Sequence, residues 1–105
     1  MKVKKSARID KCRAEILIAA ITVIEPMYKL YGQELVITSG TEKYKHKALH
    51  SHHYRGDAID LRHRYFNDEE KREIRDSLRN DLGKHFVVLL EKTHFHVAYS
   101  PIYGV

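Results

Sequence analysis

Residues 50 to 62 read HSHHYRGDAIDLR and combine three His with two Asp. His53 and Asp60 are the pair in this stretch whose spacing suits metal chemistry. If the segment after Gly56 is extended, Asp60 shares a face with small Ala58, and a turn at Gly56 brings His53 back over that face. Zinc accepts an imidazole nitrogen together with a carboxylate oxygen. The spacing therefore predicts two metal ligands, with a solvated polar loop as the alternative.

A second pair of His lies near the end of the chain, in the run HFHV. His94 and His96 are two positions apart, so on a strand both side chains point to one face. If that strand neighbours the one with Asp60, either His can supply a third ligand. Three protein ligands and one open position are typical of a catalytic zinc, whereas a structural zinc has four closed ligands.

A hydrolytic zinc site also needs a base, and Glu91 is the candidate. It ends the apolar run FVVLL and comes just before the two His. A carboxylate in that place would be partly shielded from water, which suits proton transfer.

The elements that must position these side chains follow from hydrophobic periodicity. Apolar residues recur at helical spacing from Ile9 to Leu30, with Ser6 as a candidate cap and Pro26 as a kink or break. A buried strand is expected over 34–39, a polar loop over 40–52 and a second strand over 57–61.

In the second half of the chain, the sequence marks the ends of the helix and strands more clearly. Residues 67 to 83 predict a helix, with Asn67 and Glu70 as a capping box and Gly83 as its end. The runs 85–90 and 94–99 read as strands joined by a tight hairpin. The order helix, strand, strand, helix, hairpin predicts a single α+β domain over residues 1–105, with a small, mostly antiparallel sheet packed against helices.

Composition narrows the class of protein without naming a function. The chain has 105 residues, 43% of them hydrophobic, and a formal net charge of +5. One Cys excludes an intrachain disulfide, and no apolar run approaches the roughly 20 residues of a membrane span. No signal peptide is recognisable, so synthesis in the cytoplasm is expected. The basic charge suits nucleic acid or an anionic cell wall, but no nucleic-acid-binding motif is present, and no nucleic-acid partner is predicted.

Taken together, the motifs resemble those of the zinc D-Ala-D-Ala carboxypeptidases and L-Ala-D-Glu endopeptidases, which cleave peptidoglycan stem peptides, with the hedgehog signalling domain as a relative. The pattern SxHxxGxAxD of that group is complete here, and the late Glu followed by HxH stands as EKTHFHV. The resemblance covers roughly residues 33 to 99. The matching positions of the longer hedgehog-like pattern are Thr38, Gly40, His46, Ser51, His53, Tyr54, Gly56, Ala58 and Asp60.

The resemblance implies a role for each matching residue. His53, Asp60 and His96 would bind Zn²⁺, and Glu91 would be the catalytic base, with His94 beside the metal or on the oxyanion side. The spacing ExxH of some carboxypeptidases would select His94 as the ligand instead, but the hedgehog-like match favours His96. Ser51 would orient the site.

Two departures qualify the resemblance. Many peptidases of the group have SGYR after the first strand, with the Arg facing the substrate, and this chain has SGTEK. Lys43, His46 or Arg62 would have to replace that charge. The hedgehog calcium site needs several carboxylates, and only Glu42 is near, so calcium is not predicted.

The implied activity is hydrolysis of a peptide bond in peptidoglycan by zinc-bound water, as carboxypeptidase or endopeptidase. The small chain without a wall-binding module resembles phage or prophage lysis enzymes (endolysins) and tail-associated enzymes. The alternative is a catalytically silent, hedgehog-like zinc module that binds a partner.

Outside the motifs, His50 and His52 are expected to be solvated or substrate-side. His63 and the basic residues of 67–83, such as Lys71, are expected at the surface.

Overall fold

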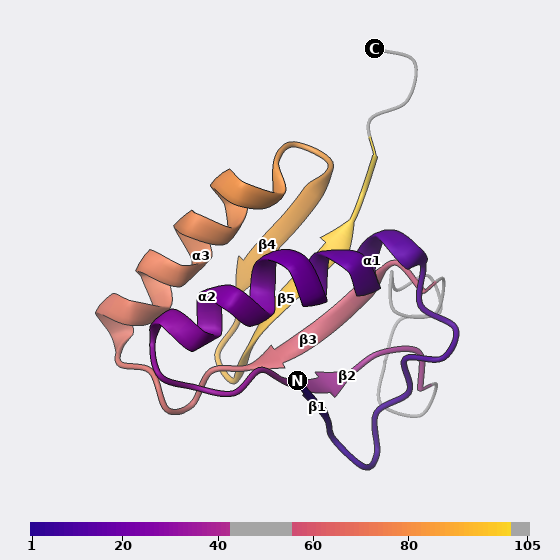
Figure 1. The fold of residues 1–105 in the computed structure, drawn as a ribbon, viewed down its shortest axis with the longest axis horizontal. Helices are drawn as coiled ribbons and strands as arrows, with labels where there is room; N and C mark the ends of the chain where they lie inside the picture. The colour runs from indigo at the N-terminus through magenta and orange to yellow at the C-terminus, as the bar shows by residue number, and fades with distance from the viewer. Residues whose placement is uncertain (43–55, 102–105) are drawn as a thin grey trace.

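The computed structural model of the chain describes residues 1–42 and 56–101. Figure 1 shows helices and strands arranged as one sheet with helices packed on it. In chain order the elements are β1 (Lys2–Val3), α1 (Ala14–Ala19), the π-helical turn η1 (Ala20–Ile24), α2 (Glu25–Leu30), β2 (Val36–Ser39), β3 (Ala58–Arg62), α3 (Asp68–Leu82), β4 (Phe86–Leu90) and β5 (His94–Tyr99).

The five strands form one sheet in the order β1-β2-β3-β5-β4. Only the short β1–β2 pair is parallel among these strands, and the other three pairings are antiparallel. The predicted α+β class with a mostly antiparallel sheet is therefore confirmed. β3 has β2 on one side and β5 on the other, so the strand that carries Asp60 lies in the middle of the sheet.

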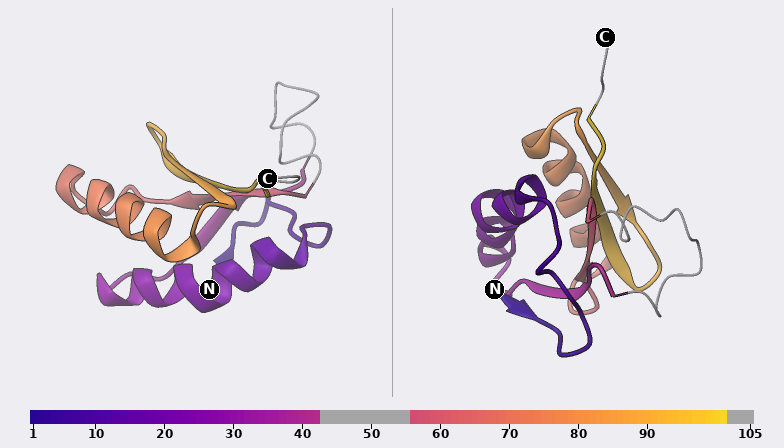
Figure 2. Two further views of the ribbon diagram at one scale, coloured as in Figure 1. Left: turned by 90° about the horizontal axis from the view of Figure 1, so that it is seen from above. Right: turned by 90° about the vertical axis from the view of Figure 1, so that its right-hand side faces the viewer.

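Helices cover one face of this sheet, as the edge-on view on the left of Figure 2 shows. Ile59 and Leu61 of β3 point to that face and are fully buried. Alternation along the strand sends Ala58, Asp60 and Arg62 to the opposite face. The core between the helices and the sheet includes Ile16, Ala20, Ile24, Tyr28, Ile37, Ile59, Leu61, Ile74, Leu78, Val88, Phe95 and Val97.

Helix α3 begins and ends as its sequence predicts. The Asn67 side chain accepts a hydrogen bond from the Glu70 backbone N–H, and the Glu70 carboxylate accepts one from the Asn67 N–H. This capping box satisfies two backbone donors that a helix start leaves unpaired. Ile74 and Leu78 are the buried residues of the helix, and Gly83 follows it with a positive φ.

The first helix differs from its prediction at the start and at Pro26. It begins at Ala14 rather than near Ile9, and its N-cap is Arg13, which has no side-chain cap, rather than Ser6. Pro26 does not end the helix. It sits in the first turn of α2, directly after the wider π-helical turn η1. Proline lacks an N–H and its ring crowds the carbonyl four residues earlier, which here belongs to Thr22 of η1.

Residues 8–13 are irregular and contact the chain at Glu42 and at Gly56, on either side of residues 43–55. The Glu42 carboxylate, 4% exposed, accepts hydrogen bonds from the backbone N–H groups of Arg8 and Gly40. Burial raises the pKa of Glu42, but these bonds and one from the Ser39 hydroxyl outweigh it and lower that pKa. On the other side of residues 43–55, the Arg13 N–H donates to the Gly56 carbonyl over 2.8 Å.

The remaining boundaries lie close to those expected. The strands 34–39, 57–61 and 85–90 begin or end one or two residues away from prediction, and β5 matches 94–99. The tight hairpin between β4 and β5 is confirmed. The two-residue β1 carries no sequence signal of its own and was not predicted. None of the helices in residues 1–42 and 56–101 combines the length and apolar character that a bilayer span needs.

Candidate active site

Asp60 and His96 face each other across β3 and β5. The two residues are directly paired in the antiparallel register, and their side chains lie on the face of the sheet away from the helices. The Asp60 Oδ1 atom is 3.0 Å from His96 Nδ1. The two strands are therefore neighbours, as the metal hypothesis required, and their register together with strand alternation places this carboxylate beside this imidazole.

His94 approaches the other oxygen of the same carboxylate. Its Nε2 atom is 3.5 Å from Asp60 Oδ2. Its Nδ1 atom is 2.9 Å from the Thr93 hydroxyl oxygen. When the Thr93 hydroxyl donates to Nδ1, Nε2 carries the ring proton and faces the carboxylate. One carboxylate thus contacts both His of the HxH motif, each through a separate oxygen.

The separation of Asp60 and His96 suits a shared zinc ion. Two ligand atoms held at about 2.0–2.1 Å around a tetrahedral zinc lie roughly 3.3 Å apart, close to the 3.0 Å between Asp60 Oδ1 and His96 Nδ1. The donor types, one carboxylate and imidazole nitrogens, are also those that zinc prefers. Within residues 1–42 and 56–101, however, no three His, Cys, Asp or Glu side chains form a metal-binding group. A third ligand would have to come from the residues outside that part of the chain.

Glu91 lies at the hairpin next to these side chains. Its N–H donates to the His94 carbonyl over 2.9 Å, so the β4–β5 register continues to this pair. Continuing the alternation from Leu89, which pairs with His96, assigns Glu91 to the same face as the site. The expected shielding is wrong, because Glu91 is exposed where the hairpin leaves the sheet.

His63 is a residue that the sequence did not single out. It was expected at the surface but is 1% exposed, with its ring edge-on to Phe95. Its Nε2–H donates to the Glu91 carbonyl over 2.8 Å, which ties the end of β3 to the hairpin that carries Glu91. Burial lowers the pKa of His63. Phe95, against which the ring packs, comes from β5, and nothing in the sequence around His63 indicates this contact.

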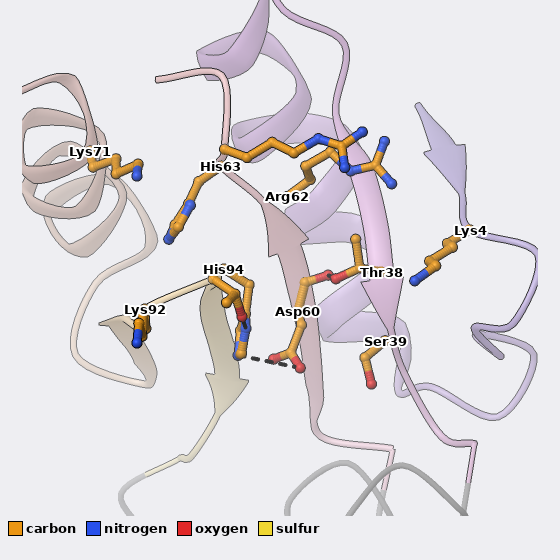
Figure 3. Close-up of a pocket in the computed structure, with 11 residues that line it drawn as sticks. Lys4, Thr38, Ser39, Asp60, Arg62, His63, Lys71, Lys92 and His94 are labelled. Atoms are coloured by element: carbon orange, nitrogen blue, oxygen red, sulfur yellow. Dashed lines mark hydrogen bonds and ion pairs between the residues drawn. The ribbon is translucent and has the colours of Figure 1, made fainter. Parts of the chain in front are cut away.

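A cleft of about 640 Å³ opens beside Asp60 and His94. Figure 3 shows Lys71 and Lys92 on one side of it and Lys4 on the other, beyond Thr38 and Ser39 of β2. Arg62, predicted to face the substrate, lines this cleft. Lys71 also lines it rather than lying on a purely solvated helix face. Among residues 1–42 and 56–101, the lining consists of Lys4, Thr38, Ser39, Asp60, Arg62, His63, Arg64, Lys71, Lys92, Thr93 and His94.

Several predicted site residues lie outside the described part of the chain. His53, the expected third zinc ligand, and His46 and Ser51, expected on the substrate side, fall within residues 43–55. His50 and His52 are in the same range. The structure does describe the residues that flank this range, Glu42 and Gly56. Gly56, where the turn was expected, has a φ of 77° and lies against Lys11.

Comparison with known proteins identifies the family. The family model described as Peptidase M15 matches residues 1–98, nearly the whole chain. The chain therefore belongs to the peptidase M15 family, which agrees with the resemblance drawn from its motifs. No curated protein and no solved structure gives a significant match. The family supports a peptidase, and hence a peptide substrate, for this fold and this group of polar side chains.

Proposed function

We propose that this protein is a zinc-dependent peptidase that hydrolyses a peptide bond in peptidoglycan stem peptides. The observation that carries the proposal is Asp60, whose Oδ1 atom faces His96 at a distance that suits a common metal, with His94 beside its other oxygen. In this proposal Asp60 and His96 are two zinc ligands and His53 is the third. Zinc bound there would polarise the peptide carbonyl and make water a better nucleophile at neutral pH.

The protein's own side chains would perform the proton transfers. Glu91 would accept a proton from the attacking water and deliver it to the leaving amine, and its exposure leaves it accessible to both. His94 is held by Thr93 and faces the metal site through Nε2, where it would stabilise the developing oxyanion. Arg62 would contact the substrate from the cleft.

The cell wall fits this proposal because the protein and the wall carry opposite charges. A net charge of +5 would draw the enzyme toward an anionic polymer. We include in the proposal that the enzyme reaches the wall through lysis or on a virion, as phage-type enzymes of similar size do.

The first test is digestion of purified peptidoglycan, with mass spectrometry of the released muropeptides. We expect new amino termini with the unaltered protein and a loss of rate of about 10²–10⁴-fold for Glu91→Gln. Zinc content should stay the same in that variant, because Glu91 is not a proposed ligand. His96→Ala should lose both the zinc and the activity.

The same experiment separates the enzyme from a silent zinc module. Bound zinc that is lost on His96→Ala, together with no new amino termini at any pH tested, would favour the binding module. No zinc in the purified protein, and equal metal content in the His96→Ala variant, would contradict both.

A further inference from the structure

The walls of the cleft beside Asp60 carry far more positive than negative charge. Five Lys or Arg side chains line it, and Asp60 is the one acidic residue among the described lining. Within residues 1–42 and 56–101, none of the five is joined to a carboxylate by an ion pair. The five are Lys4, Arg62, Arg64, Lys71 and Lys92.

The cations come from four separate parts of the fold and lie on both sides of the candidate metal site. Lys71 projects from α3 and Lys92 from the β4–β5 hairpin, on one side of Asp60 (Figure 3). Lys4 follows β1 on the other side, and Arg62 ends β3 between them. Positive groups around a concave site focus the electrostatic potential and attract anions into it.

The shape and lining of the cleft favour a small anionic ligand over nucleic acid. Its volume of about 640 Å³ is in the usual range for small-molecule sites. Single-stranded nucleic acid is generally held by bases stacked on aromatic rings. The described lining contains no Phe, Tyr or Trp. Arginine guanidinium groups bind carboxylates in a two-pronged geometry, so Arg62 and Arg64 suit a carboxylate ligand.

We infer that this cleft selects peptides that carry two free carboxylates. This inference rests on the proposed function and narrows it to a substrate class. Arg62 would bind one carboxylate and Lys71 the other, so that both anionic groups of the peptide are held beside Asp60. Amidation of either carboxyl group would remove one charge-assisted contact.

The test measures equilibrium binding by titration calorimetry, using Glu91→Gln protein with zinc added so that no turnover occurs. The probes are the synthetic peptide L-Ala-γ-D-Glu-L-Lys with both carboxylates free, its two monoamides and its diamide. We expect each amidation to weaken binding about tenfold, equivalent to about 1.4 kcal/mol.

Added Arg62→Gln and Lys71→Gln substitutions identify the two contacts. Each should weaken diacid binding about tenfold and abolish the penalty for amidating one carboxylate, a different one in each variant. Arg72→Gln is the matched control, because it removes the same charge from α3 at an exposed position outside the cleft. Its affinities should stay unchanged.

Equal affinity for the diacid and the diamide would overturn the inference. So would tighter binding of a ten-nucleotide single-stranded DNA that Arg62→Gln and Lys71→Gln both weaken, because the cleft would then serve nucleic acid. Selective binding of the diacid, combined with no hydrolysis of peptidoglycan by the unaltered protein, would keep the inference and reject the proposed function. Cleavage of peptidoglycan without any preference for the diacid would do the reverse.

Discussion

At the scale of single residues, the candidate site depends on Asp60, which reaches two imidazoles through two different oxygens. The sequence predicted that His94 and His96 share a face, because they are two apart on a strand, and that they could join Asp60 if their strands were neighbours, which β3 and β5 are. It did not predict buried His63. The run RHR at 62–64 suggests an exposed turn, and only the packing of Phe95 against the ring makes position 63 internal.

His63 should make the stability of the protein depend on pH. Burial lowers the pKa of His63, the hydrogen bond from Nε2 to the Glu91 carbonyl opposes that shift, and nearby Lys71 and His94 add to it. The folded state therefore favours the neutral ring. Its contribution to stability is complete above the unfolded-state pKa of about 6.5 and is lost as pH falls below that value.

Urea unfolding of the unaltered protein and of His63→Gln at pH 7.5 and pH 5.5 would measure this effect. The destabilisation caused by His63→Gln should be smaller at the lower pH, with a slope of at most about 1.4 kcal/mol per pH unit. The same free-energy difference at both pH values would contradict the assignment.

At the scale of elements, the sequence predicted most accurately where local chemistry sets the boundary. Helix α3 shows this, because its capping box and Gly83 specify both ends. Prediction was weakest over residues 8–13, where the helical period of Ile9 and Cys12 continues but the backbone is not helical. There, tertiary contacts to Glu42 and Gly56 outweigh the local pattern, and such contacts cannot be read from periodicity.

Gly56→Ala should show how closely residues 8–13 pack against the end of the 43–55 segment. Gly56 has a φ of 77°, and an added Cβ would lie 2.4 Å from the Lys11 carbonyl oxygen. Gly32→Ala is the matched control, because Gly32 has a φ of 73° but nothing within 4 Å of the added atom.

Both variants carry the cost of a left-handed backbone, roughly 1–2 kcal/mol. Only Gly56→Ala adds a backbone clash, so its free energy of unfolding should fall by at least about 1 kcal/mol more than that of Gly32→Ala. Thermal or urea denaturation measures the difference. Equal losses in the two variants would show that residues 8–13 move aside freely.

At the scale of the whole molecule, the apolar core and the candidate site lie on opposite faces of the sheet. Its covered face holds the apolar core, and its other face holds Asp60, His94 and His96. The class of fold could be predicted because the strand alternation encodes both faces at once. The cationic cleft could not, because Lys4, Arg62 and Lys92 lie far apart in the sequence and only the completed fold brings them together.

Because the proposed ligands come from different strands, zinc should stabilise the whole fold. A ligand that binds only the folded state adds about 2.7 kcal/mol when its free concentration is 100 times Kd. We expect Tm to rise on adding zinc to the chelator-treated protein, and Asp60→Asn to remove most of that rise. An increase of equal size in the Asp60→Asn protein would place the zinc elsewhere.

The bracing of the chain on both sides of residues 43–55 bears on how new specificities can arise. Glu42 and Gly56 are both held by contacts with residues 8–13, so the two ends of this range are fixed within the described part of the chain. Lengthening a segment whose ends are already held costs little, since the entropic penalty grows only with the logarithm of its length. Exchange or extension of residues 43–52, with His53 retained, is therefore a route by which evolution or design can retarget the peptidase while the sheet and the proposed zinc ligands stay in place.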